Sequence, residues 1–392
     1  MEQFLVFSPI EIILAGATTF LFLMVLLYLL IVFTRPRRFL KKQNGTDEEK
    51  KQLPVSVIIY ACGQTESLRD NLPAFLSQDY PDYEVIVAND GSDSDSDELL
   101  RTIEQSKSRL YHTNIPDETR YLSRKKLALT LAVKAAKHEI LLFTEADCAP
   151  ASEHWISEMC GDYDDKTSLV LGFSRYSSGK GFFNKLVAYD NLLNAVRQFA
   201  SAIKHKTYAG NGRNLSYRKS LFFKHKGYYQ SLNLHAGADD LFVNEASTRE
   251  NTRIMLHADS FTEYHDMEAV TFKDIKIGRM ATEKYYRGVS LTFHRFFTFL
   301  GVLLFPAVAV LTLVIGLFGN WMISIWAGLL LVIRFVVKAI LLHRNARLFG
   351  QKPHTFWLII FDWYHPLYDF YLHLYHQSKK KNDYTFVIND KY

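Results

Sequence analysis

The stretch from Ile12 to Phe33 contains no charged residue, and it limits the possible folds more than any other part of the chain. About 20 consecutive apolar residues are enough for a helix to cross a bilayer. A cleaved signal peptide is the alternative, but such peptides begin with basic residues and end at a small-residue cleavage site. This chain has Glu2 and Glu11 and no such site. The sequence therefore predicts an N-terminal transmembrane anchor at residues 1–34.

Two more apolar runs predict a transmembrane helix pair at residues 291–345. They extend from Phe299 to Phe318 and from Trp321 to Leu342, with Gly319-Asn320 as the turn. Basic residues follow the first anchor and stand on both sides of the pair: Arg35, Arg37, Arg38, Lys41, Lys42, Arg287, Arg295, Arg344 and Arg347. Because basic flanks stay on the cytoplasmic side, we expect the N-terminus outside and residues 35–52 to be a cytoplasmic juxtamembrane linker.

The segment from His354 to His376 is rich in aromatic residues but also carries aspartates and histidines. This mixture favours an interfacial helix on the cytoplasmic side, within a tail of residues 346–392. A fourth span is the alternative, although it would place Lys379-Lys380-Lys381 outside, against the positive-inside rule. Arg334 and Lys338, near the cytoplasmic end of the preceding run, are expected to snorkel towards the interface.

Residues 53–290 read as a cytoplasmic domain in which strands alternate with helices. Strands are predicted at 54–60, 83–88 and 140–143, and helices at 66–78, 96–106 and 123–137, with Ser123 as the N-cap of the last. This order predicts βαβ units and a mostly parallel α/β sheet. The three cysteines, Cys62, Cys148 and Cys160, are too few for a disulfide framework and suit a reducing compartment.

A further amphipathic helix is predicted from Phe182 to Ile203. It either packs on the sheet, which we favour, or lies at the membrane face and steers a lipid acceptor inward. The net charge of +5 is no argument for nucleic acid, because much of the positive charge stands beside the membrane segments. Anionic lipid is the simpler partner there.

Glu145 and Asp147 follow the strand at 140–143 with one residue between them. Ligands of an open α/β sheet bind outside the carboxyl ends of its strands. Mg²⁺ and Mn²⁺ bind there through one or two carboxylates together with substrate phosphates. These two carboxylates therefore form a candidate metal site, although acidic pairs after strands are often only solvated loops.

Five motifs, in order, resemble those of membrane-bound family 2 glycosyltransferases, which have the GT-A fold and invert the anomeric centre. They are the strand Val55-Ser56-Val57-Ile58-Ile59 followed by Gln78-Asp79-Tyr80-Pro81, then Asn89-Asp90-Gly91-Ser92-Asp93, the run from Gly210 to Lys219, Gly237-Ala238-Asp239-Asp240, and Lys276-Ile277-Gly278-Arg279-Met280. The resemblance covers residues 53–287, and membrane helices flank it as in that subgroup. It implies a GT-A-type nucleotide-sugar-binding sheet.

The resemblance also implies roles for particular residues. Asp240 is the expected catalytic base, with Asp239 as the reserve, and Asp147 with Glu145 is expected to hold Mg²⁺ or Mn²⁺ against the donor diphosphate. Asp90, with Asn89 before it, is expected to bind the nucleotide. The cationic residues assigned to the nucleotide or its diphosphate are Arg279, Lys276, Lys125 and Lys126.

Four positions depart from the family pattern. Glu145 replaces the usual first aspartate of the metal motif, Asn89 stands where many relatives have aspartate, and Lys276 and Met280 replace a glutamine and a tryptophan. The last change weakens any expectation of processive polymer synthesis.

The sequence thus predicts an inverting glycosyltransferase anchored in the inner membrane, with its catalytic domain in the cytoplasm. It would transfer sugar from a nucleotide donor, preferably a UDP-sugar, to a lipid or lipid-linked glycan. One alternative is a non-catalytic subunit on the same fold. A sugar nucleotidyltransferase is the other, although the segment after the first strand, Ala61-Cys62-Gly63-Gln64-Thr65, lacks the basic residue such enzymes carry there.

Overall fold

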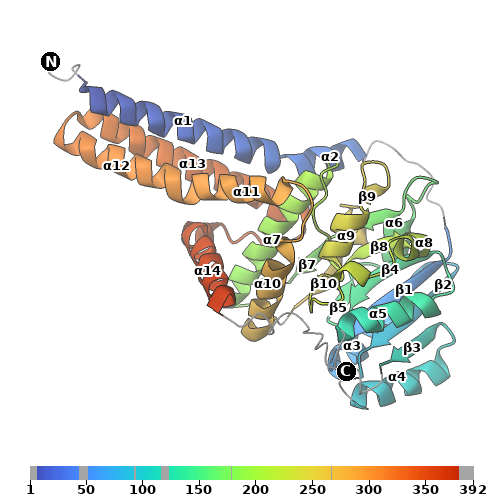
Figure 1. The fold of residues 1–392 in the computed structure, drawn as a ribbon. Helices are drawn as coiled ribbons and strands as arrows, with labels where there is room; N and C mark the ends of the chain where they lie inside the picture. The colour runs from blue at the N-terminus through green and yellow to red at the C-terminus, as the bar shows by residue number, and fades with distance from the viewer. Residues whose placement is uncertain are drawn as a thin grey trace, which may run out of the picture.

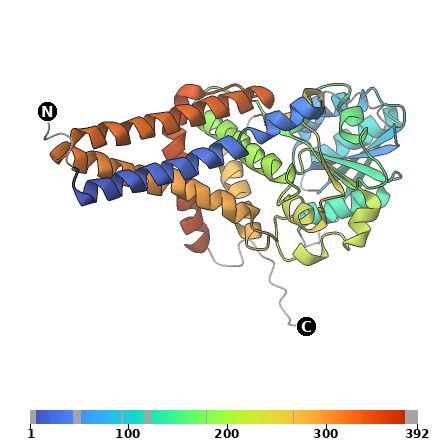
Figure 2. The same ribbon diagram turned by 90° about the horizontal axis from the view of Figure 1, so that it is seen from above.

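The computed structural model describes residues 7–43, 52–91, 94–115, 123–177, 179–265 and 267–378. Ser92 and Asp93 of the predicted nucleotide motif lie outside the described residues, as does the lysine run at 379–381. A sheet domain occupies one end of the molecule, and a bundle of long helices projects from it (Figures 1 and 2).

The central sheet has seven strands in the order β3-β2-β1-β4-β8-β6-β9. Their bounds are β1 Val55–Ala61, β2 Tyr83–Asn89, β3 Leu110–Asn114, β4 Ile140–Glu145, β6 Leu169–Leu171, β8 Leu215–Arg218 and β9 Thr252–Ile254. The first four strands of this order are parallel to one another, and β8 is antiparallel to both of its neighbours. The expected mostly parallel α/β sheet is therefore confirmed. A small second sheet, β5-β10-β7, consists of Cys148–Pro150, Thr262–Tyr264 and Ser174–Tyr176.

The central strands are apolar on both faces because both faces are covered by helices. Ile58, Ile86 and Phe143 belong to one core cluster, while Val57 and Val85 belong to the other. The short helices of this domain are α3 Thr65–Leu76, α4 Ser94–Ser106, α5 Arg124–Ala135, α6 Trp155–Cys160, α8 Lys219–Lys224 and α9 Asp240–Ala246, with 3₁₀ turns η2 Tyr229–Ser231 and η3 Ala258–Ser260.

Ser123 is at the predicted N-cap position of α5, but its side chain does not cap the helix. The Ser123 hydroxyl instead donates a hydrogen bond to the carbonyl of His235, 3.0 Å away. The prediction of its position was right and the prediction of its bond was wrong, because a distant loop offers an acceptor that local sequence does not show.

Among the described residues, three helical segments are long and apolar enough to cross a membrane: Pro9–Gln43, Ser290–Phe318 and Trp321–Leu348. The first consists of α1 Pro9–Val32 and α2 Arg35–Gln43. The second consists of α11 Ser290–Phe299, a π-helical turn η4 Leu300–Leu304, and α12 Phe305–Phe318, and the third is α13 Trp321–Leu348. The expected one N-terminal and two C-terminal membrane helices are thus present. The first part of the predicted linker at 35–52 is helical instead, as α2.

Polar contacts join the membrane helices at the end of the bundle that carries the N-terminus. The Glu11 carboxylate accepts a hydrogen bond from the backbone N–H of Asn320, 2.8 Å away, in the α12–α13 turn. Further along, the hydroxyls of Thr18 and Thr312 are 2.8 Å apart. Because an unpaired polar group in hydrocarbon is costly, these contacts favour one arrangement of the three helices.

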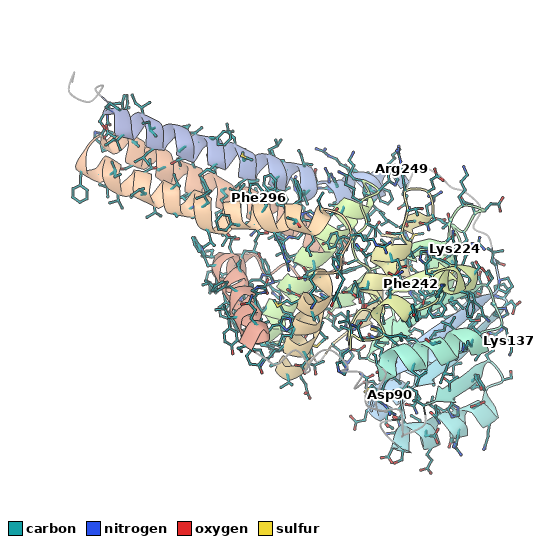
Figure 3. The ribbon with its side chains drawn as sticks, in the orientation of Figure 1. Asp90, Lys137, Lys224, Phe242, Arg249 and Phe296 are labelled. Carbon is teal, nitrogen blue, oxygen red and sulfur yellow. The ribbon has the colours of Figure 1, made fainter. Side chains whose placement is uncertain are left out.

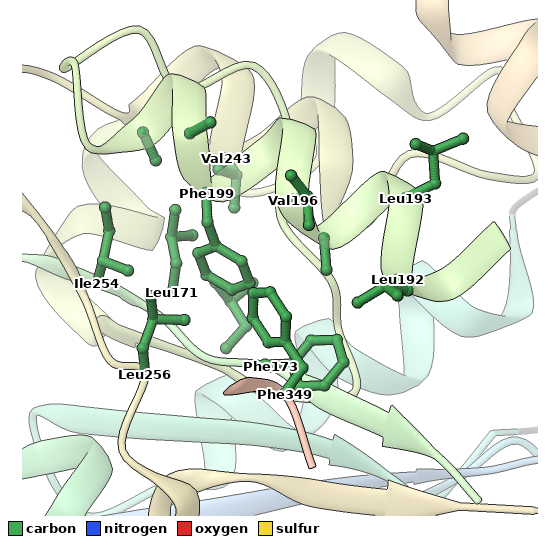
Figure 4. Packing of buried hydrophobic residues seen from close by; sticks show 14 of the residues in the cluster. Leu171, Phe173, Leu192, Leu193, Val196, Phe199, Val243, Ile254, Leu256 and Phe349 are labelled. Carbon is green, nitrogen blue, oxygen red and sulfur yellow. The ribbon is translucent and has the colours of Figure 1, made fainter. Parts of the chain in front are cut away.

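Three helices fill the space between the sheet domain and the bundle: α7 Phe182–Ala202, α10 Ala269–Glu283 and α14 Leu358–Ser378, the last preceded by the 3₁₀ turn η5 Thr355–Trp357 (Figure 1). Figure 4 shows how α7 reaches the sheet, with Phe199 and Val196 packed near Leu171 and Phe173. The ring of Phe349, just after α13, lies 4.6 Å from that of Phe173, so the membrane helices and the sheet share one core.

Arg334 and Lys338 do not snorkel as predicted. Arg334 is 6% exposed, and its Nη1 lies 2.8 Å from Oδ2 of Asp362 on α14. Lys338 pairs with the other oxygen of the same carboxylate. Both cations therefore join α13 to α14. The Asp362 carboxylate is buried beside them, so they pair with it and do not extend to the bilayer surface.

Candidate active site

The carboxyl ends of β1, β2 and β4 lie in register, and this alignment gathers the first part of the site. Tyr60 is paired with Glu145, and Ala61 is paired with Asn89. Asp90 follows β2 and is buried, with the hydroxyl of Tyr60 3.3 Å from its Oδ2. Figure 3 shows Asp90 in the sheet domain, away from Phe296 of the bundle.

Asn89 is fully buried at the end of β2. Its Oδ1 lies 3.4 Å from the backbone N–H of Gly91 and accepts a hydrogen bond from it, while its Nδ2 has no partner among the described residues. Asn89 therefore shapes the turn that carries Asp90. Gly91 has a φ of +71°, and a Cβ there would lie 2.8 Å from the Ile115 carbonyl oxygen.

Glu145 and Asp147 converge on a single cation. Nη2 of Arg213 lies 2.9 Å from Glu145 Oε2 and 2.8 Å from Asp147 Oδ2. Two carboxylates whose oxygens meet at one point match the donor set of Mg²⁺ or Mn²⁺. The residues therefore fit a divalent ion if the Arg213 side chain moves aside or turns towards the phosphates.

The charges around Glu145 keep it ionised. Burial alone would raise its pKa, but the charges of Arg213 and then Lys125 outweigh burial and hold the pKa of Glu145 at about 2. Lys125 forms an ion pair with Glu145 and lies 5.0 Å from the Tyr60 ring. Lys125 is therefore beside the metal carboxylates, where sequence reasoning expected a nucleotide contact.

Lys126 points elsewhere. It is 1% exposed, and its ammonium group donates hydrogen bonds to the carbonyls of Ser231 and, at 3.0 Å, Leu234. Burial lowers the pKa of Lys126 to about 8, although the charges of Asp240 and Asp239 oppose this shift. In this structure the Lys126 ammonium group stabilises the turn at residues 231–234, and it makes no hydrogen bond or ion pair with Glu145 or Asp147.

Asp239 and Asp240 are adjacent but have different surroundings. Asp239 Oδ2 accepts a hydrogen bond from the backbone N–H of Gly212, 2.8 Å away, and Asp239 lines a small pocket together with Glu145 and Lys125. Because Gly212 precedes Arg213, this hydrogen bond fixes Asp239 beside the metal carboxylates. Asp239 thus faces the side of the site expected to bind the donor.

Asp240 is 5% exposed and faces the opposite side. Its Oδ2 accepts hydrogen bonds from the hydroxyls of Thr282, at 2.5 Å, and Tyr286, at 2.7 Å. Burial and then the neighbouring charge of Asp239 raise the pKa of Asp240. A carboxylate with a raised pKa is suited to accept a proton near neutral pH.

Asp240 opens into a cavity of about 510 Å³ between the sheet domain and the membrane helices. The cavity is lined by parts of α7, α10, α11, η4 and α14, and Arg279 is in its wall. Arg279 makes no ion pair or side-chain hydrogen bond with any described residue. The nearby charges that act on it include Asp190 and Asp239. Its guanidinium is thus available to a ligand, and its role as a diphosphate contact stays a prediction.

Lys276 lies in the same wall but is already paired. It is 8% exposed, and its Nζ lies 2.6 Å from Asp190 Oδ1 and 2.7 Å from Asp369 Oδ1. His365 Nε2 lies 2.7 Å from the same oxygen of Asp190. Lys276 therefore joins α10 to α7 and α14. Helical spacing in the sequence did not predict these ion pairs.

Sequence reasoning missed three contributors. Arg213 was given no role of its own in the sequence, yet it links the predicted metal ligands. Thr282 and Tyr286, which bind Asp240, had no motif to mark them. Arg213 stands inside the Gly210–Lys219 motif, and two unpaired carboxylates after β4 call for a cation, so its role could have been inferred.

Residues 56–224 match the family model described as glycosyl transferase family 2. This region is a family 2 glycosyltransferase domain. No curated protein matches the chain.

Among solved structures, the chain is similar to the mannosyltransferase PcManGT from Pyrobaculum calidifontis in complex with GDP-Man and Mn²⁺. The identity is 18%, the match covers 94% of this chain and 100% of that chain, and the TM-score is 0.58. A match to S. aureus TarS 1-349 in complex with UDP-GlcNAc has 17% identity, covers 75% of this chain and 73% of that chain, and has a TM-score of 0.37. The first likeness shows that the GT-A fold extends to this chain.

Proposed function

We propose that the protein is a membrane-anchored inverting glycosyltransferase that transfers a sugar from a nucleotide donor to a lipid or lipid-linked glycan. The observation that carries this proposal is the position of Asp240. Asp240 lines a large cavity that is also lined by α11 and η4 of a candidate membrane span, and the neighbouring Asp239 lines the pocket of Glu145. Donor and acceptor would therefore meet at this carboxylate.

The reaction follows from these positions. An acceptor hydroxyl in the cavity would give its proton to Asp240 as its oxygen attacks the anomeric carbon of the sugar. The bond between that carbon and the diphosphate oxygen breaks, and the nucleoside diphosphate leaves. Attack from the side opposite the leaving group inverts the anomeric configuration.

Asp147 and Glu145 would hold the divalent cation. When bound, the ion supplies positive charge to the departing diphosphate. Arg279 would add a guanidinium, which matches phosphate oxygens in a bidentate way. Asp90, buried at the end of β2, would accept hydrogen bonds from the nucleotide, and a UDP-sugar is our first choice of donor.

The membrane arrangement supports the same function. Three candidate spans lie on one side of the sheet domain. By the positive-inside rule, their basic flanks favour a cytoplasmic position for that domain and an N-terminus outside. Residues 346–392 would then include an interfacial helix, α14. Its exposed large side chains include Ile359, Trp363, Leu367 and Phe370, as in a helix that lies on a bilayer.

A second candidate is a non-catalytic subunit on the same fold. Arg213 engages both metal carboxylates, and a protein that never binds a metal would keep that arrangement. A cation bound in place of the metal would leave nucleotide binding to Asp90 and Arg279, without a metal ion at the diphosphate.

The test is nucleotide release from a panel of nucleotide sugars by purified protein, with lipid extract and with Mn²⁺, Mg²⁺ or EDTA. We expect release from one donor, its loss in EDTA, and its loss in Asp147→Asn. Nucleotide binding without release from any donor would favour the non-catalytic subunit. If no nucleotide binds, the assignments of Asp90 and Asp147 are wrong.

A further inference from the structure

The cavity beside Asp240 has a polar wall and an apolar wall. The polar wall includes Asn194 and Arg197 of α7 and Arg279 of α10, and the apolar wall includes Phe299 and Leu303 of the α11–η4 segment. Phe370 of α14 extends the apolar wall. Phe299, Leu303 and Phe370 are 52%, 50% and 61% exposed, so this wall continues onto the outer surface of the molecule.

The apolar wall is formed where the second candidate span is irregular. Residues Leu300–Leu304 form a π-helical turn, and Val302 and Leu303 of this turn line the cavity. Single π-turns inside α-helices are frequent at functional sites. Because this turn belongs to a segment apolar enough to cross a bilayer, hydrocarbon chains have a route from the membrane to the cavity.

Most charges in the cavity wall are neutralised by each other. Lys276 pairs with Asp190 and Asp369, and Arg295 pairs with Glu283. Two hydroxyl groups hold Asp240. In the described part of the chain, Arg197 and Arg279 are the cavity's cations that have no carboxylate within ion-pair distance.

Arg197 is the less expected of the two, because it stands on α7, outside every motif of the sequence. Its Nη2 donates a hydrogen bond to the hydroxyl of Thr298, 2.8 Å away, and its Nε is buried without a hydrogen-bond partner among the described residues. Removing a guanidinium from water without an opposite charge costs several kcal/mol. A ligand that brings a negative charge to Arg197 would offset that cost.

We infer that Arg197 binds the phosphate of an anionic acceptor lipid that also carries a free hydroxyl. The inference deepens the proposed function and rests on it for the role of the lipid as acceptor. The hydroxyl would reach Asp240, the phosphate would lie against Arg197, and the hydrocarbon would leave between η4 and α14. A neutral lipid such as diacylglycerol would leave Arg197 unpaired and bind less well.

The test is direct binding of small probes to the purified full chain in neutral detergent. Dioctanoyl phosphatidylglycerol carries phosphate, hydroxyls and acyl chains; dioctanoylglycerol lacks the phosphate; glycerol 3-phosphate lacks the chains. We expect phosphatidylglycerol to bind at least 10-fold more tightly than dioctanoylglycerol, because one charged hydrogen bond contributes about 1.5–3 kcal/mol. It should also bind at least 10-fold more tightly than glycerol 3-phosphate, because only the lipid buries acyl chains.

Arg197→Gln should bring phosphatidylglycerol to the affinity of dioctanoylglycerol, and Arg197→Lys should keep part of the preference. Arg344→Gln is the matched control, because Arg344 is exposed on α13 and is not in the cavity wall. Nucleotide binding should be unchanged in all three variants, which shows that they fold.

Equal affinity of the wild-type protein for phosphatidylglycerol and dioctanoylglycerol would overturn the inference without any variant. Equal losses in Arg197→Gln and Arg344→Gln would also overturn it, since the preference would then be a surface effect. If glycerol 3-phosphate binds as tightly as phosphatidylglycerol, the ligand is a soluble phosphate. Failure of the proposed function gives a different result: phosphatidylglycerol binds through Arg197, but no donor is ever turned over.

Discussion

At the scale of single residues, Asp239 and Asp240 at the start of α9 face two different parts of the site, the pocket of Glu145 and the large cavity. Asp239 is held by a backbone N–H at the metal side, and Asp240 is held by two hydroxyls at the cavity. Gly237 has a φ of +97°, and a Cβ there would meet Leu241 Cδ1 at 2.6 Å. Glycine is therefore required for the turn that presents both carboxylates.

The raised pKa of Asp240 predicts the pH dependence of the transfer. The base acts in its ionised form, so kcat/KM should fall as pH drops through that raised pKa. Because the charge of Asp239 contributes to the shift, Asp239→Asn should move the acid limb of the profile to lower pH. Asp274→Asn, at an exposed position on α10, is the control. An acid limb that does not move in Asp239→Asn would contradict this account.

Sequence reasoning at this scale worked where strand geometry decides position. Asp90, Glu145 and Asp147 follow parallel strands, so their approach to one edge follows from the order of elements alone. The contacts that Lys126 and Lys276 make within the protein could not be predicted, because a helical pattern gives the face of a residue and not its distant partner; their nucleotide roles stay predictions. Their partners are the 231–234 carbonyls and Asp190, which are far away in sequence.

At the scale of elements, α14 is held to the rest of the protein by charge as well as by packing. Asp362 binds Arg334 and Lys338 of α13, while Asp369 and His365 join Lys276 of α10 and Asp190 of α7. The second group of contacts lies in the cavity wall. The position of α14 therefore sets the size of the space available to an acceptor.

Removing the charge of Asp362 should loosen α14. Asp362→Asn leaves two largely buried cations without a carboxylate, and breaking a buried ion pair costs about 3–5 kcal/mol. We expect a lower thermal unfolding temperature in detergent and faster proteolytic cleavage after η5. Asp274→Asn should change neither quantity. Unchanged proteolysis in Asp362→Asn would show that packing alone holds α14.

The existence of these helices could be predicted from apolar runs, but their junctions could not. The sequence indicated the spans, the Gly319-Asn320 turn and the helix around residue 354–376. The linker beginning at Arg35 is helical in its first part because α2 continues from α1 and contacts α7. Whether the helix continues past α1 depends on tertiary contacts of α2. The sequence of a charged segment with low hydropathy does not show such contacts.

At the scale of the whole molecule, the catalytic domain and the membrane bundle share one core, so their relative position is fixed by packing. In the proposed topology, the positive-inside rule would orient both parts. Cys62 is exposed, whereas Cys148 and Cys160 are buried. A membrane-impermeant maleimide should therefore label Cys62 in inverted vesicles but not in right-side-out vesicles.

A cysteine at position 318 should be labelled from the opposite side of the membrane to Cys62. Phe318 is 90% exposed at the end of α12 that lies beside the N-terminal end of α1. In a Cys62→Ser background, Phe318→Cys should be labelled only in right-side-out vesicles. Labelling of both cysteines from the same side would contradict the assigned topology.

The most direct test of the central claim is sugar transfer into the lipid phase by membranes that contain wild-type protein, Asp240→Asn or Asp274→Asn. With labelled donor and Mn²⁺, we expect Asp274→Asn to equal the wild type. Asp240→Asn should lose about 10²–10⁴-fold in rate, as for removal of a general base, while its nucleotide binding stays the same. Transfer by Asp240→Asn at the wild-type rate would contradict the claim that this carboxylate is the base between donor and acceptor.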